Sequence, residues 1–328
     1  MQKIASYKKA LQHAMARLES ISSPSDIWAF FVRVLAFTIG RAFNLEKLRL
    51  YDTKQTGMFA YRKLAPYFDG EKYDFNGIYL PLPPFENDYG NLAELYSCFK
   101  DVLGVYLHNN DDYFWKYVDK LEKRLVEGVY CYHNAEEGIK ILINKDDVVL
   151  DLGAWIGDFS AYASKKGAIV YAFEPLRETR VLLEKTVEYN KGNGGEIHIV
   201  PYGVGSENAS VTFYRYGGHA ASSTFIEANA FGCTDMERVD VVKLDDWAQQ
   251  ENIKINFIKA DIEGFERNML KGAANILKTQ QPILSLCTYH YPDDPAVMEK
   301  LILEANPNYR IIQRQMKLFA YVPCKLKS

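Results

Sequence analysis

Two glycines and two acidic residues lie at a spacing that could hold a nucleotide-like cofactor. Asp151, Gly153 and Gly157 follow the apolar run VVL, and Glu174 lies near the end of the next apolar run, AIVYAFEP. A glycine after a strand permits a sharp turn and lets a ligand approach the backbone closely. An acidic side chain at the end of the adjacent strand can bind both hydroxyls of a ribose. The pattern therefore predicts a cofactor site built from two neighbouring strand ends.

The spacing of the glycines indicates which kind of cofactor fits. A dinucleotide needs G-x-G-x-x-G, so that its pyrophosphate rests on a helix N-terminus. Here the turn reads Gly153-Ala-Trp-Ile-Gly157, and Trp155 is bulky where a diphosphate would have to approach. S-adenosylmethionine has no phosphate and is therefore the predicted cofactor, and Trp155 is expected to be one of the residues that contact it. The alternative is that both glycines only permit tight packing of a helix on a strand, with Glu174 a solvated strand end.

Methyl transfer from a sulfonium to a hydroxyl benefits from a base near the accepting oxygen, and three side chains could provide it. Asp261 and Glu263 follow the run INFIKA, and His290 ends the run PILSLCTYH. His290 is the predicted base, because its ordinary pKa lies near physiological pH. Asp261 could orient the acceptor or the sulfonium end, and Glu263 could be a second base or an orienter. Alternatively, Glu263 caps the helix that begins near Phe265, and His290 is a structural part of its turn.

The same three residues, Asp261, Glu263 and His290, could also bind a divalent metal. Magnesium and manganese prefer several oxygen ligands. Only two carboxylates are offered, so no metal is predicted.

Further residues are predicted to contact the acceptor or the cofactor. The segment GGHAASSTF (217–225) is either a flexible surface loop or a lid whose polar side chains meet the ligands. Tyr289 precedes His290 and is predicted to bind the acceptor. Tyr202 and Gly203 follow a predicted strand and would flank the adenine, although a packed tyrosine is an alternative there. The polar side chains of the predicted lid are His219, Ser222 and Ser223.

The elements that must position these residues alternate between strand and helix from residue 140 onward. This rhythm predicts an α/β fold with a doubly wound, mostly parallel sheet. The helix over 177–190 is expected to turn Val181, Leu182 and Val187 inward, and 209–216 is expected to be an edge strand. Core strands are predicted at 148–153, 168–175, 196–204, 255–264 and 282–290, helices at 156–166, 265–278 and 295–305, and further strands near 309–313 and 317–322.

Residues 1–126 have a different sequence pattern. Helical periodicity predicts helices within residues 1–66 and over 91–107 and 112–127, whereas YLPLPPF predicts an extended crossing between them. We therefore expect a mostly helical N-terminal region at 1–126 and a cofactor-binding domain at 127–328.

Three segments together resemble the FkbM family of S-adenosylmethionine-dependent methyltransferases. They are DLGAWIGDFS, YAFEP and IKADIEGFERNMLKGA, the last preceded by LDDW at 244–247. The resemblance covers about residues 128–290. It implies a Rossmann-like class I methyltransferase fold and methylation of a hydroxyl oxygen on a sugar, glycan precursor or related natural product. The chain departs from many members at Cys287–His290, where they carry an acidic residue within the strand.

Composition restricts the partners and the compartment. The formal net charge is -3 with a pI of about 6.1, so no basic field indicates a nucleic-acid partner. The five scattered cysteines form no C-x-x-C pair and favour a reducing compartment. The apolar segment WAFFVRVLAFTIG is too short to span a membrane, so a cytoplasmic location is expected. Two rival functions stay open: a nicotinamide-dependent oxidoreductase on a similar sheet, and a non-catalytic cofactor-binding module.

Overall fold

A computed structural model of the chain describes residues 67–75, 77–81, 125–127, 130–134, 137–216, 219–224, 235–314 and 317–326. The helices expected within 1–66 and at 91–107 lie outside these residues, as does the segment WAFFVRVLAFTIG. Within the described residues, no helix combines the length and the apolar character needed to cross a membrane.

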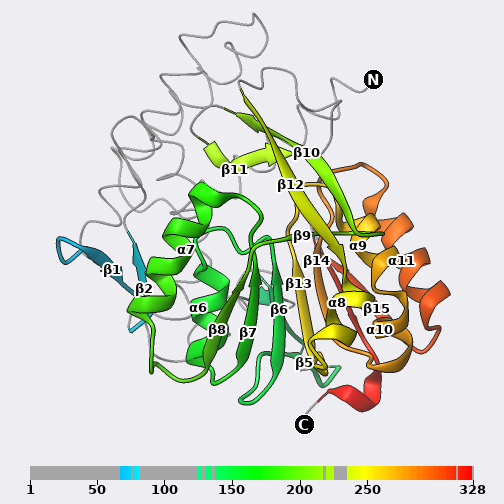
Figure 1. Cartoon of the computed structure of the whole chain (residues 1–328). Coiled ribbons are helices and arrows are strands. Elements are labelled where there is room, and N and C mark those ends of the chain that lie inside the picture. The colour runs from blue at the N-terminus through cyan, green and yellow to red at the C-terminus, as the bar shows by residue number, and fades with distance from the viewer. Residues whose placement is uncertain are drawn as a thin grey trace, which may run out of the picture.

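A seven-stranded sheet forms the centre of the described structure (Figure 1). Its strand order is β15-β16-β14-β13-β6-β7-β8, and every pairing is parallel except the two made by β16. This order and direction confirm the predicted α/β fold with a doubly wound, mostly parallel sheet. The strands are β6 (Val148–Leu152), β7 (Ile169–Phe173), β8 (Glu196–Val200), β13 (Phe257–Ala260), β14 (Ile283–Cys287), β15 (Arg310–Arg314) and β16 (Lys317–Tyr321).

Helices cover both faces of this sheet. One face packs against α8 (Leu244–Gln250), α9 (Glu266–Gly272), α10 (Ala274–Thr279) and α11 (Asp294–Ala305), and the other against α6 (Asp158–Lys165) and α7 (Arg177–Tyr189). A short 3₁₀ helix, η3 (Pro323–Lys325), follows the last strand. The predicted helix over 265–278 is divided into α9 and α10 at Ala273.

Alternation along each strand separates the core into two layers. Leu150 and Leu152 of β6 and Ile258 of β13 pack with the helices α8 to α11, whereas Val149 and Phe257 pack on the opposite face. Successive side chains of a strand point to opposite faces. The same alternation places Asp151 and Lys259 on the second face, which determines their contacts in the site described below.

A second, four-stranded sheet stands beside the first, with the order β11-β10-β12-β9. Its strands are β9 (Gly203–Gly205), β10 (Ala209–Tyr216), β11 (His219–Thr224) and β12 (Asp235–Lys243). The strand predicted over 196–204 is therefore wrong in length, because β8 ends at Val200 and β9 belongs to the other sheet. The edge assignment of 209–216 is also wrong, since β10 pairs with β11 and β12.

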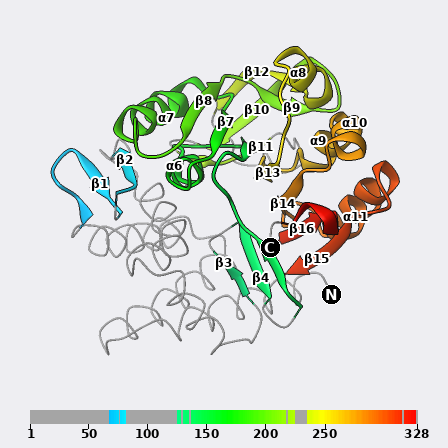
Figure 2. The same ribbon diagram turned by 90° about the horizontal axis from the view of Figure 1, so that it is seen from below.

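The N-terminal part contributes strands rather than helices to the described residues. They form a hairpin of β1 (Lys72–Asp74) and β2 (Tyr79–Pro81) and a three-stranded sheet of β3 (Leu125–Glu127), β4 (Cys131–Asn134) and β5 (Ile139–Ile141). Residues 125–127 are strand β3, which corrects the end of the helix predicted over 112–127. The expected domain boundary at 126/127 falls within β3. Figure 2 shows the hairpin beside α7.

Candidate cofactor and acceptor site

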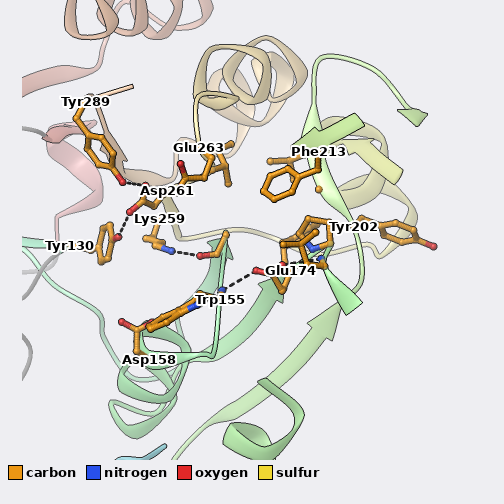
Figure 3. A pocket seen from close by; sticks show the side chains of 17 residues that line it. Tyr130, Trp155, Asp158, Glu174, Tyr202, Phe213, Lys259, Asp261, Glu263 and Tyr289 are labelled. Atoms are coloured by element: carbon orange, nitrogen blue, oxygen red, sulfur yellow. Dashed lines mark hydrogen bonds between the residues drawn. The ribbon is translucent and has the colours of Figure 1, made fainter. Parts of the chain in front are cut away.

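A pocket opens at the carboxyl ends of β6, β7, β13 and β14, where a doubly wound sheet binds its ligands (Figure 3). It brings together eight of the residues predicted from the sequence: Gly153, Trp155, Glu174, Tyr202, Gly203, Asp261, Glu263 and Tyr289. The other lining residues that matter below are Tyr130, Asp158, Phe173, Leu176, Phe213 and Lys259. Asp151, Gly157 and His290 do not line it.

The glycines of the first turn are required by packing. Gly153 has φ 74°, and a Cβ built there would lie 2.0 Å from the backbone oxygen of Asp261. Gly157 has φ 88°, and its Cβ would lie 2.5 Å from Leu183 Cδ1 on α7. Gly153 thus serves both packing and the pocket, whereas Gly157 serves the packing of α7. Gly157 does not line the pocket, and its contact with the cofactor stays a prediction.

Asp151 lies beneath the pocket and carries an ion pair. Its Oδ1 is 2.8 Å from the Lys259 Nζ, and its Oδ2 accepts a 2.6 Å hydrogen bond from Ser160 Oγ. Both charged side chains are almost fully buried. Lys259 and Ser160 contact its carboxylate, and Asp151 does not line the pocket, so its contact with the cofactor stays a prediction.

Lys259 was not predicted as a site residue. Its Nζ also donates to the backbone oxygens of Gly153 (2.7 Å) and Leu152 (3.3 Å), so it fixes the first turn from below. Burial alone would lower the pKa of Lys259, but the charges of Asp151 and Asp261 outweigh burial and raise it. The signal was a lone lysine inside the otherwise apolar strand INFIKA.

Glu174 follows β7 and is bound to the first turn. Its Oε2 accepts a hydrogen bond from the backbone N–H of Trp155 (3.1 Å) and its Oε1 one from Leu176 (2.9 Å). Burial raises the pKa of Glu174 to about 7. Two of the four lone-pair positions of a carboxylate are thus used, and the remaining ones can accept from a ribose.

The walls on either side of Glu174 differ in character. Phe173, Leu176 and Phe213 provide an apolar side that suits a flat base. Gly203 also lines the pocket, and the Tyr202 ring is 38% exposed and points away from Asp261 (Figure 3). Asp158 lines the opposite side near Trp155, and burial raises its pKa to about 6. Asp158 carried no sequence signal beyond its place after Gly157.

Asp261 follows β13, and its carboxylate accepts hydrogen bonds from two tyrosine hydroxyls. Tyr289 donates to its Oδ1 at 2.7 Å and Tyr130 to its Oδ2 at 2.9 Å. Burial alone would raise the pKa of Asp261, but the charges of Lys317 and Lys259 hold it below its usual range. Asp261 is therefore a carboxylate at neutral pH. Tyr130 lies far from the motif segments in the sequence, and nothing in its local pattern indicated this contact.

Glu263, His290 and Glu266 form a charged cluster next to Asp261. Glu263 has a left-handed backbone conformation with φ 56°, which is uncommon for a residue with a side chain. The Nε2 of His290 is 3.5 Å from Glu263 Oε2, and its Nδ1 is 3.3 Å from Glu266 Oε2. Burial raises the pKa of Glu263 to about 7.

The surroundings of His290 change the pKa of its imidazole from the ordinary value. Burial alone would lower its pKa, but its contacts with Glu263 and Glu266 outweigh burial and raise that pKa to about 10. An imidazole with this pKa is protonated at neutral pH and cannot accept a proton from a hydroxyl. This corrects the argument that its ordinary pKa suits it to be the base.

One atom each from Asp261, Glu266 and His290 lies within 4.8 Å of the others, which is close enough to share a divalent cation. Glu266 has other partners, however, because its two carboxylate oxygens accept hydrogen bonds from the backbone N–H groups of Ile262 (2.8 Å) and Gly264 (3.1 Å). A protonated His290 supplies one positive charge next to these two carboxylates.

The predicted lid residues His219, Ser222 and Ser223 lie in β11, which pairs antiparallel with β10. A flexible surface loop is therefore the wrong description of residues 219–224.

Residues 151–311 match the family model described as the methyltransferase FkbM domain. The hexuronic acid methyltransferase AglP of Haloferax volcanii is 28% identical over 174 residues, which cover 52% of this chain and 68% of that protein. Methyltransferase 1 of Beauveria bassiana is 28% identical over 147 residues, which cover 39% of this chain and 58% of that protein.

Among solved structures, the methyltransferase FkbM from Methylobacillus flagellatus KT superposes with a TM-score of 0.46 at 19% identity. The superposition covers 81% of this chain and 59% of that one. The chain thus spans about three fifths of the Methylobacillus and Beauveria proteins that it matches.

Proposed function

Residues 151–311 are a methyltransferase FkbM domain, and from this premise we propose that the protein transfers a methyl group from S-adenosylmethionine to a hydroxyl oxygen of a sugar, a glycan precursor or a related natural product. One observation supports this proposal above the others. A single pocket joins the Gly153 turn and Glu174, which suit the cofactor, to Asp261 and Glu263, which suit a hydroxyl acceptor.

The cofactor would be held at the β6 and β7 ends. Glu174 would accept hydrogen bonds from the ribose hydroxyls, because its carboxylate is already oriented by two backbone N–H groups. The adenine would lie among Phe173, Leu176 and Phe213. Bound there, S-adenosylmethionine supplies an activated methyl group, whose bond to sulfur breaks with its electron pair going to sulfur as the new bond to oxygen forms.

The acceptor would be held at the β13 and β14 ends. Asp261, ionised and fixed by Tyr130 and Tyr289, would accept a hydrogen bond from the acceptor and orient it. Glu263 would take the proton that the hydroxyl loses on methylation. A base works best with a pKa near the operating pH, and the pKa of Glu263, about 7, meets that condition, whereas the lowered pKa of Asp261 does not.

A sugar acceptor is proposed for two reasons. The name of the Haloferax relative gives a hexuronic acid as its acceptor, and aromatic side chains on the acceptor side suit the apolar face of a sugar ring. Tyr130 and Tyr289 flank Asp261, and Tyr289 is 40% exposed at the mouth of the pocket.

The test has two parts. Calorimetry of the full chain should show binding of S-adenosylhomocysteine and none of NAD; the opposite result would favour the oxidoreductase. Radiolabelled S-adenosylmethionine should then transfer its methyl group to members of a panel of neutral glycosides, uronides and nucleotide sugars. Methylation that appears with wild type and falls at least 100-fold with Glu263→Gln supports the assignment. Cofactor binding without transfer to any panel member would favour a binding module.

A further inference from the structure

One buried imidazole lies between two carboxylates that come from different parts of the loop and helix after β13. The His290 side chain is 7% exposed, with Nδ1 3.3 Å from Glu266 and Nε2 3.5 Å from Glu263. Asp261 Oδ1 lies 3.9 Å from the same Nε2. Neither ring nitrogen makes a hydrogen bond of regular geometry, so the contacts are those of an ion pair.

Glu266 is the fixed end of this arrangement. Its side chain is fully buried, and both of its oxygens accept hydrogen bonds from backbone N–H groups of the loop, at Ile262 and Gly264. Glu266 also begins α9, which packs against α11. The carboxylate of Glu266 therefore cannot move without unfolding the loop that carries Glu263.

The conformation of Glu263 depends on contacts from its surroundings. Its backbone has φ 56°, a conformation that costs free energy and persists only where the surroundings impose it. Its side chain is 28% exposed and lines the acceptor side of the pocket. His290 is the cationic contact that connects this carboxylate to Glu266.

We propose that His290 is a positioning residue, a buried imidazolium that links Glu266 to Glu263 and holds the Glu263 carboxylate at the acceptor side of the pocket. This inference rests on the proposed function in one respect, that Glu263 takes the acceptor proton. His290 itself is not among the residues that line the pocket.

The surrounding charges support an imidazolium. Asp261 and Glu263 face the ring from the segment after β13, Glu266 faces it from α9, and the Tyr289 ring lies 4.2 Å from it, centroid to centroid. The lysines that act on this cluster, Lys317 and Lys259, do so through Asp261. Without a charge on His290, Glu263 and Glu266 would repel one another, and the pKa of Glu263 would rise.

The first test requires no acceptor. The full chain contains six histidines, whose ring nitrogens can be labelled with ¹⁵N and followed by NMR. At pH 8.5 an ordinary imidazole is neutral, whereas His290 should keep both nitrogens protonated. The ¹⁵N signal of this doubly protonated ring should be missing from His290→Gln. It should persist in His198→Gln, a control variant at an exposed histidine on β8. Six neutral imidazoles at pH 8.5 would overturn the proposal.

The second test separates positioning from proton transfer. His290→Gln should move the acidic limb of the pH profile of kcat/KM upward by at least one unit and leave S-adenosylhomocysteine affinity within twofold. In a Glu263→Gln background the same change should cost less than twofold. Loss of activity with an unmoved limb would make His290 the base instead, and activity that EDTA removes and Mg²⁺ restores would indicate a metal. Either result contradicts the proposal.

These outcomes are distinct from those of the proposed function. If wild type methylates no acceptor, the proposed function fails, but the NMR measurement still decides whether His290 is an imidazolium. If wild type is active and all six imidazoles are neutral at pH 8.5, the proposed function stands and the positioning role is lost.

Discussion

Glu174 is the residue whose ionisation should be visible in cofactor binding. Its pKa is raised by burial to about 7 from an ordinary 4.5, so the folded protein keeps a proton that the unfolded chain has lost over this range. The stability contributed by Glu174 is therefore complete below pH 4.5 and declines as the pH rises to 7. A ribose hydroxyl is better bound by the ionised form, which accepts with both oxygens.

We therefore expect affinity for S-adenosylhomocysteine to rise with pH between 6 and 8, with a midpoint near 7. Glu174→Gln should abolish this dependence and weaken binding about tenfold at pH 8, or about 1.4 kcal/mol. Isothermal titration calorimetry measures both effects. Glu184→Gln is the matched control, since Glu184 is exposed on the same helix that follows Glu174. Equal affinity at pH 6 and 8 in wild type would remove Glu174 from the site.

The sheet elements β6 and β13 are connected by the buried pair Asp151–Lys259 below the first turn. Removing one partner of a buried pair leaves an uncompensated charge and costs about 3–5 kcal/mol. Lys259→Met should therefore lower the free energy of unfolding by about this amount in urea denaturation. The Lys259→Met/Asp151→Leu double variant should be more stable than Lys259→Met alone, because no charge is left buried.

The control for this pair is Lys300–Glu304 on α11, whose side chains are exposed. Lys300→Met should cost less than about 0.5 kcal/mol, as is usual for exposed pairs at this spacing on a helix. A double variant less stable than Lys259→Met would show that Asp151 stabilises the turn through Ser160 rather than through the lysine.

At this scale the sequence predicted the central sheet well, because its strands are buried on both faces and read as apolar runs. The sequence-based prediction failed where contacts between distant parts of the chain determine the structure. The fully buried residues of α7 are Thr179, Leu183 and Thr186. Of the three residues predicted to face inward, Leu182 and Val187 are half-buried, and Val181 is 49% exposed. The division of 196–204 between two sheets depends on pairing with β12, which lies some forty residues away.

In the candidate site, too, some residues could be predicted from the local sequence, whereas their partners come from distant parts of the chain. Glu174 and Asp261 directly follow strands that the sequence identifies, and Glu263 lies two residues after Asp261, so their meeting at one edge was predictable. The partners of Asp261 and His290 were not, since Tyr130 and Glu266 approach from separate elements. The ordinary pKa of histidine indicated a base, whereas the two glutamates around His290 make it a cation.

For the molecule as a whole, the N-terminal hairpin packs on α7 and the residues after it through two asparagines, the buried Asn190 and Asn193, whose side-chain amide donates to the backbone oxygen of Gly77. Asn190, at the end of α7, accepts from the backbone N–H of Tyr79 (3.0 Å) and donates to the backbone oxygens of Tyr79 (2.6 Å) and Thr186 (2.7 Å). These two contacts with Tyr79 imitate a strand pairing. We therefore propose that residues 67–81 fold together with the domain that begins later in the chain.

Asn190→Ala should loosen β2 from α7, because it leaves the Tyr79 N–H and C=O without their partners on Asn190, while Asn193 still donates to Gly77. Each lost buried hydrogen bond costs about 1–3 kcal/mol, so amide exchange over 78–81 should accelerate at least tenfold. Hydrogen exchange with mass spectrometry measures this directly, and peptides from β6 and β13 should keep their protection. Asn275→Ala, on the exposed surface of α10, should leave the hairpin protected. If exchange rises equally in β6 and β13, Asn190 supports the whole sheet, and the hairpin is not a separately docked element.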